Sequence, residues 1–228
     1  MVFYNKYLRF YKPKINLFNI HYQYLNSLSL NPKSIHFLKK NLNIIDWYLL
    51  SLNEYAISIL KNNLNKINWD NLSENPNAID ILNNNLDKIN WNELSFNPNA
   101  IELLIFNFDK INWDNLSLNP NAINILTSNF DKINWDNLSL NPNAIELLTS
   151  NIDKINWYLI SLNPNAINLI ENNLDKINWF NLNKNKNALH LVKKYNCYIY
   201  IDNIDTSNIN YILSDPNLFY SNFIIINL

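Results

Sequence analysis

The sequence predicts an all-α fold, an α-solenoid of 22-residue repeats that each hold one longer helix and one short α or 3₁₀ helix. Asparagine recurs at an unbroken spacing of 22 residues, at Asn31, Asn53, Asn75, Asn97, Asn119, Asn141, Asn163 and Asn185. All seven tryptophans keep one phase of the same period, at Trp47, Trp69, Trp91, Trp113, Trp135, Trp157 and Trp179. Self-similarity at a period of this size is typical of stacked repeat proteins.

The first helix of each unit is expected to start at the repeated asparagine. In the unit that begins at Asn119, this residue is a good N-cap, and Pro120 takes the first helical position, where its missing N–H costs nothing. A buried stripe of this helix is formed by Ala122, Ile123, Ile125 and Leu126. Asn129 is expected to end the helix in a left-handed conformation, because asparagine tolerates that conformation and the chain has no glycine.

A second, shorter helix is expected to begin with Asp131 as its N-cap, with Phe130 and Trp135 forming a hydrophobic staple across the cap. The same aspartate recurs at Asp87, Asp109, Asp131, Asp153 and Asp175. This ladder could form metal sites, but capping is favoured because aspartate is preferred there and a lysine follows each one. The tryptophan ladder could stack nucleic-acid bases, but the packed core between repeats is favoured.

Neither helix is long enough to be stable alone, so each unit must bury its apolar face against its neighbours. We expect one continuous domain, with a degenerate N-terminal cap at residues 1–30 and seven repeats at 31–184. Residues 185–228 are expected to form a degenerate repeat and a C-terminal cap. Tyr198–Ile201 and Phe223–Ile226 favour β structure, which leaves a small β element in that cap open.

The unit Asn-Pro-Asn-Ala-Ile … Asp-Lys-Ile-Asn-Trp-x-x-Leu-Ser, matched over residues 31–184, resembles repeats in proteins of giant amoeba-infecting DNA viruses. It is similar, more loosely, to leucine-rich-variant repeats. This resemblance implies a viral source and an α-solenoid, and it carries no biochemical activity or functional residues to transfer. A location in the host cytoplasm or the virion would follow from it.

The sequence gives little support to an enzyme, a cofactor or a metal site. His21, His36 and His190 are scattered, Cys197 has no identifiable base, and a chain without glycine cannot form a glycine-rich phosphate loop. Residues 1–66 carry nine basic and two acidic residues, whereas residues 67–183 carry five basic and fourteen acidic. An acidic middle repels phosphates, so nucleic-acid binding is disfavoured, although the basic N-terminal end leaves a weak form of it open. We expect neither a signal peptide nor a transmembrane segment.

Specificity in a repeat protein is expected at the positions that vary, because packing fixes the scaffold positions. Apolar residues interrupt the polar variable positions at Ile105, Phe106, Tyr48, Leu49, Tyr158, Leu159 and Phe180. Ile105 and Phe106 lie mid-array and form the leading candidate site, while packing against a cap competes as an explanation for Tyr48 and Phe180. The sequence therefore favours a non-enzymatic scaffold for a protein partner. A self-assembling, virion-associated protein is the alternative.

Overall fold

The computed structural model describes residues 27–195, which lie in two compact units, Met1–Asn97 and Pro98–Leu228. The first unit contains η2 (Pro32–Ser34), α2 (Ile35–Lys40), η3 (Leu42–Ile44), α3 (Trp47–Leu52), α4 (Ile57–Leu60), η4 (Leu64–Lys66), α5 (Trp69–Glu74), α6 (Ile79–Asn83), η5 (Leu86–Lys88) and α7 (Trp91–Phe96). The second contains α8 (Ile101–Phe106), η6 (Phe108–Lys110), α9 (Trp113–Leu118), α10 (Ile123–Ser128), η7 (Phe130–Lys132), α11 (Trp135–Leu140), α12 (Ile145–Thr149), η8 (Ile152–Lys154), α13 (Trp157–Ile160), α14 (Ile167–Glu171), α15 (Trp179–Leu182), η9 (Lys186–Ala188) and α16 (Leu189–Lys194).

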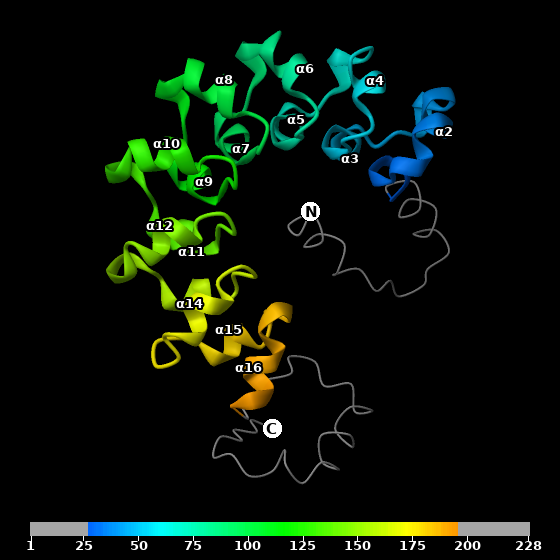
Figure 1. Ribbon diagram of the computed structural model, residues 1–228. Helices are drawn as coiled ribbons and strands as arrows, with labels where there is room; N and C mark the ends of the chain where they lie inside the picture. Colours follow the sequence, from blue (N-terminus) through cyan, green and yellow to red (C-terminus); the bar gives the residue numbers. More distant parts are fainter. Residues whose placement is uncertain (1–26, 196–228) are drawn as a thin grey trace, which may run out of the picture. The chain divides into compact units, whose positions relative to one another are not determined.

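The predicted all-α solenoid is confirmed, because helix pairs of one pattern pack in sequence order in each unit and no strand occurs between residues 27 and 195. The tryptophan-bearing helices pack on one another, α3 on α5 and α5 on α7 in the first unit, and α9 on α11 and α11 on α13 in the second. The other helices of each unit form a second layer (Figure 1). Over the described residues, no helix has both the length and the apolar character needed to cross a membrane.

Each repeat buries a small apolar set between its two helices. In the repeat from Asn119, Ala122, Leu126 and Leu138 are completely buried, and Ile133 nearly so. Burying a leucine side chain stabilises a fold by about 1.5–3 kcal/mol, so each repeat adds a similar increment as it stacks on the last. The buried alanine leaves room for close backbone approach at the start of α10.

Within each unit, asparagine side chains join a repeat to the one before it. The amide Nδ2 of the buried Asn141 donates to the backbone carbonyls of Ser117 and Asn119, at 3.0 and 2.9 Å. Asn143 Nδ2 donates to the carbonyl of Pro120 at 2.9 Å, and Asn137 Nδ2 to that of Asp114 at 2.8 Å. The same bonds recur in other described repeats, for example from Asn75, Asn77 and Asn71. Asparagine suits these positions because one side chain can donate across the repeat boundary and accept within its own repeat.

A buried serine joins the tryptophan-bearing helix of one repeat to the next repeat. Ser139 Oγ donates to the carbonyl of Trp135 at 2.8 Å and accepts the backbone N–H of Asn156 at 3.0 Å. Ser51, Ser73, Ser117 and Ser161 make the same pair of bonds. The buried serine hydroxyl and the backbone N–H of the next repeat, which have no access to water inside the stack, therefore both have a hydrogen-bond partner.

The predicted start of the first helix is wrong for the repeat from Asn119. Helix α10 begins at Ile123, and Asn119 Oδ1 instead accepts the N–H of Asn121 at 3.0 Å, which forms a turn. Asparagine binding its own backbone two residues later, followed by proline, is a common way to make such a turn. The prediction holds only at the first and last described repeats, where Asn31 and Asn185 cap the short 3₁₀ helices η2 and η9.

The aspartate ladder does not cap the second helix. Asn134 caps α11, because its Oδ1 accepts the N–H of Asn137 at 3.0 Å, and Asp131 lies three residues earlier, inside η7. Equivalent asparagines cap α5, α7, α9, α13 and α15. Three exposed members of the ladder pair instead with the lysine that follows, as Asp87–Lys88, Asp109–Lys110 and Asp131–Lys132. Among the tryptophan-bearing helices between residues 27 and 195, only α3 has an aspartate, Asp46, in the capping position.

Asn129 ends α10 without a left-handed conformation, contrary to the prediction. Its φ is −131°, and its Nδ2 donates to the carbonyl of Ile125 at 2.9 Å. The side chain therefore satisfies a carbonyl at the helix end, which glycine could not do. Asn63, Asn85, Asn107, Asn151 and Asn173 make the equivalent bond.

Several sequence predictions fall outside the described residues. These are most of the N-terminal cap at residues 1–30, the C-terminal cap beyond residue 195 with its candidate β segments Tyr198–Ile201 and Phe223–Ile226, and the residues His21 and Cys197.

Candidate protein-interaction surface

Ile105 and Phe106 lie at the C-terminal end of α8, and both are exposed, as the sequence predicts. The exposed fraction is 52% for Ile105 and 78% for Phe106, the largest among the exposed large apolar side chains of the described residues. The equivalent positions of the next repeat carry Thr127 and Ser128, whose hydroxyls bond back to their own helix. These two positions carry polar residues in the other described repeats, so the repeat that contains α8 differs in presenting two apolar side chains to solvent.

Phe108 extends this apolar pair, and sequence reasoning missed it. It begins η6 two residues after Phe106, and 47% of it is exposed. Its ring meets that of Trp113 edge-on, with the centroids 5.3 Å apart. Ile105, Phe106 and Phe108, which we call the α8 patch, are thus three exposed apolar side chains within four residues, and the ring of Trp113 packs against one of them.

The remaining candidate residues lie on the tryptophan-bearing helices instead. Tyr158 is 54% exposed at the start of α13, and its backbone carbonyl accepts Asn181 Nδ2 at 2.8 Å. Phe180 occupies the same repeat position in α15; it is half-buried, and Lys184 Nζ lies 4.1 Å from the centre of its ring. Leu159 is half-buried beside Tyr158. Of these three residues, only Tyr158 therefore presents a largely open side chain.

In the first unit, Tyr48 and Leu49 also differ from each other in exposure. Tyr48 is 58% exposed, whereas Leu49 is half-buried and its N–H donates to Asp46 Oδ1 at 3.1 Å. Leu49 is therefore engaged in the first turn of α3. Within the second unit, Ile105 and Phe106 lie on α8, whereas Tyr158, Leu159 and Phe180 lie on tryptophan-bearing helices.

A second apolar surface repeats along the 3₁₀ helices. Its half-exposed members are Leu42, Leu64 and Leu86 in the first unit and Phe108, Phe130 and Ile152 in the second. Sequence reasoning treated this position only as part of a hydrophobic staple, but an apolar residue before every Asp-Lys pair was a visible signal of this surface. The contact between Phe130 and Trp135 does exist, at 5.1 Å between ring centroids, although Asp131 is not the cap that it was expected to span.

The tryptophans are half-buried and not fully enclosed in the core. A lysine of the following repeat covers several of them: Lys154 Nζ lies 5.6 Å from the centre of Trp135, and Lys176 Nζ lies 5.2 Å from that of Trp157. Lysine stems readily cover apolar rings while the ammonium stays in water. The repeated aromatic stripe is therefore partly covered by the chain itself.

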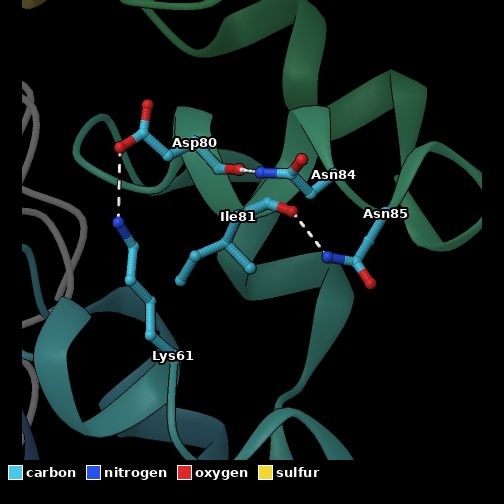
Figure 2. Close-up of polar contacts among 5 residues, drawn as sticks. All are labelled: Lys61, Asp80, Ile81, Asn84 and Asn85. Carbon is cyan, nitrogen blue, oxygen red and sulfur yellow. Dashed lines mark hydrogen bonds and ion pairs between the residues drawn. The ribbon is translucent and has the colours of Figure 1, made fainter.

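Figure 2 shows how variable positions of successive repeats meet. Lys61 Nζ pairs with Asp80 Oδ2 of the next repeat at 3.3 Å, and His190 and Glu171 meet in the same register at 3.1 Å. Asn84 and Asn85 donate to the carbonyls of Asp80 and Ile81 at the end of α6. In this register, Ile105 corresponds to Lys61 and Glu171, so it replaces a side chain that carries charge in other repeats.

One carboxyl group is electrostatically unusual. Burial raises the pKa of Glu74 above its ordinary 4.5, and the nearby negative charge of Glu93 raises this pKa further. Glu74 takes a position that carries Leu52 and Phe96 in the flanking repeats. It is therefore an acid in an apolar row, which costs stability when it ionises.

Comparison with models of protein families, with curated proteins and with solved structures found no match to this chain. Among residues 27–195, no group of three or more His, Cys, Asp or Glu residues is arranged to hold a metal ion. What these residues do present is an exposed apolar patch on a hydrogen-bonded frame, which is suited to contact with another macromolecule.

Proposed function

We propose that this protein is a non-enzymatic repeat scaffold that binds protein through apolar side chains which interrupt its otherwise polar variable positions. The observation that carries the proposal is the exposure of Ile105 and Phe106, at 52% and 78%, where the following repeat has Thr127 and Ser128. Large apolar side chains held in the open by a stable frame are the usual anchors of protein interfaces.

The frame itself supports this role. At the end of α8, Asn107 Nδ2 donates to the carbonyl of Leu103, and Asn121 Nδ2 of the next repeat donates to the carbonyl of Pro98, so the backbone that carries the patch is held in place. Pre-organised surfaces lose little conformational entropy on binding. The resemblance of the repeat unit to arrays in giant-virus proteins supports a viral source, and with it a site of action in the host cytoplasm or the virion.

The test is photo-crosslinking in cells that express the protein. A photoreactive amino acid at position 106 is expected to capture a distinct set of proteins, which one at position 128, the equivalent place in the next repeat, does not capture. The double variant Ile105→Thr/Phe106→Ser, probed from position 108, is expected to lose that set. If positions 106 and 128 captured the same proteins, or if the double variant kept them, the α8 patch would have no binding role.

A further inference from the structure

A row of exposed side chains runs across the helices that follow one another from the α8 patch. Its register is that of the ion pair between Glu171 and His190, which joins the ninth position of one repeat, counted from its first asparagine, to the sixth position of the next at 3.1 Å. Lys61 and Asp80 form the same pair in the first unit at 3.3 Å (Figure 2). The sixth and ninth positions of one repeat are neighbours because residues three apart in a helix lie on one face. Steps of these two kinds connect α8, α10 and α12 through the exposed residues that we call the α8–α12 row: Glu102, Ile105, Asn124, Thr127 and Glu146.

The α8–α12 row carries acids but no base. Glu102 lies one turn before Phe106 in α8, and Glu146 lies in α12. Among the described residues, neither of these two exposed carboxylates has an ion-pair or side-chain hydrogen-bond partner. Residues 98–183 contain nine acidic and four basic residues, and each base is a lysine that directly follows an aspartate. The lysines are thus matched by neighbouring acids, whereas the row keeps an unmatched negative charge beside the α8 patch.

A carboxylate in this register accepts a basic side chain, as Asp80 accepts Lys61 from the repeat before it. The place that faces Glu146 in the same register is held by Thr127, whose hydroxyl donates to the carbonyl of Ile123 at 2.8 Å. Threonine supplies no charge there and its hydroxyl is engaged with its own helix. The geometry that binds a lysine elsewhere in the chain is therefore present at Glu146 without its base.

From the patch and the row together, we infer that the α8 patch binds a basic segment of another protein. An apolar side chain of that segment packs on Ile105 and Phe106, and its lysine or arginine side chains pair with Glu102 and Glu146. The inference rests on the proposed function, because it takes the patch as a protein-binding surface, and it names the chemistry of the partner. Apolar anchors supply most of the affinity of such contacts, whereas charge complementarity selects the partner and orients it. The same negative charge disfavours nucleic acid as the occupant.

Selection from a phage-displayed library of random peptides, with the full chain as bait, tests the inference. The library is first depleted on the Ile105→Thr/Phe106→Ser variant, which copies the polar pair Thr127 and Ser128 and whose fold is checked by circular dichroism. The enriched peptides are expected to combine a large apolar residue with a net positive charge. Enrichment of neutral or acidic peptides overturns the inference, as does a selection that enriches nothing.

Titration of a labelled, enriched peptide against variants tests the role of the row. Glu102→Gln/Glu146→Gln should weaken binding by about threefold to tenfold, because two exposed ion pairs are lost. Asp131→Asn/Asp153→Asn is the matched control, since it removes the same amount of charge from η7 and η8, outside the row, and it should weaken binding less. Equal effects of the two double variants would overturn the pairing with Glu102 and Glu146.

The inference and the proposed function fail in different ways. If neutral or acidic peptides are enriched and their binding is lost in Ile105→Thr/Phe106→Ser, the chemistry of the partner is wrong and the proposed function stands. If nothing is enriched and positions 106 and 128 capture the same proteins in cells, both are wrong.

Discussion

Asn141 donates from its side-chain Nδ2 to the backbone carbonyl of Ser117, a residue 24 positions earlier, over 3.0 Å in the buried interior. The same side chain accepts the N–H of Asn143 through Oδ1. One residue thus closes a turn in its own repeat and fastens that repeat to the previous one.

We expect Asn141→Ala to lower the free energy of unfolding by about 3 kcal/mol, because it leaves buried backbone groups without partners. Asn143→Ala is the matched control: its bond to the carbonyl of Pro120 is exposed, so its loss should cost about 1 kcal/mol or less. Urea unfolding followed by circular dichroism measures both. Equal losses in the two variants would contradict the role assigned to the buried asparagine.

Asn134 and Asp131 offer a direct comparison of the two candidate caps. Asn134→Ala should cost about 1 kcal/mol of stability, the usual effect of losing a helix cap. Asp131→Ala should change stability by no more than about 0.5 kcal/mol, because its pair with Lys132 is exposed. Thermal unfolding of the two variants decides between them, and the reverse order would restore the aspartate as the cap.

Glycine is expected to be a poor replacement at the end of α10. Asn129→Gly should lower the free energy of unfolding by about 1 kcal/mol, because it removes the bond to the carbonyl of Ile125 and adds freedom to the unfolded chain. A left-handed cap would behave differently, since glycine fits that conformation at least as well as asparagine. Unchanged or increased stability in denaturant titrations would therefore argue against the observed φ of −131°.

Glu74→Leu should stabilise the chain at pH 7 by about 1 kcal/mol, because it restores the apolar residue found in the flanking repeats. The folded pKa of Glu74 lies above 4.5, so the folded state binds the proton more tightly. The contribution of Glu74 is thus most favourable below pH 4.5 and is lost as the pH rises through the folded pKa. The advantage of the leucine should shrink as the pH is lowered towards 4.5.

Glu93→Asn is the control for this pH dependence. It removes the neighbouring charge that raises the pKa of Glu74, so it should give a smaller gain at pH 7 in the same direction. Unfolding curves at several pH values measure both variants. A gain for Glu74→Leu that does not vary with pH would show that packing alone, without ionisation, explains it.

The repeat class and the leading surface could be predicted from the sequence, but the caps could not. Leu126 and Leu138 recur with the period, and burial follows from that recurrence; Ile105 and Phe106 break a polar pattern, which predicts exposure. Asn119 followed by proline, however, suits a turn and a helix start equally well, because both use the same side-chain acceptor. The choice between a turn and a helix start depends on hydrogen-bond partners that are distant in the sequence and belong to another repeat.

The exposed 3₁₀ position was missed for a related reason. Sequence reasoning gave Phe130 a role only in a hydrophobic staple and gave Ile152 no role, yet each lies half in solvent at the first residue of a short helix. Apolar character alone does not report depth, because folded proteins leave much apolar surface in water.

The asparagine and serine bonds between repeats described above run one way, with the donor in the later repeat and the acceptor in the earlier one, as in Asn141 to Ser117 and Asn156 to Ser139. At such a junction within a unit, the earlier repeat supplies carbonyl and hydroxyl oxygens that accept, and the later repeat supplies N–H groups that donate. Loss or duplication of a whole 22-residue segment would create a junction of the same kind as those it replaced. Such an array can gain or lose repeats during evolution while its buried contacts stay the same. The exposed apolar side chains of one repeat, such as Ile105 and Phe106, can then move with that repeat to another position in the array.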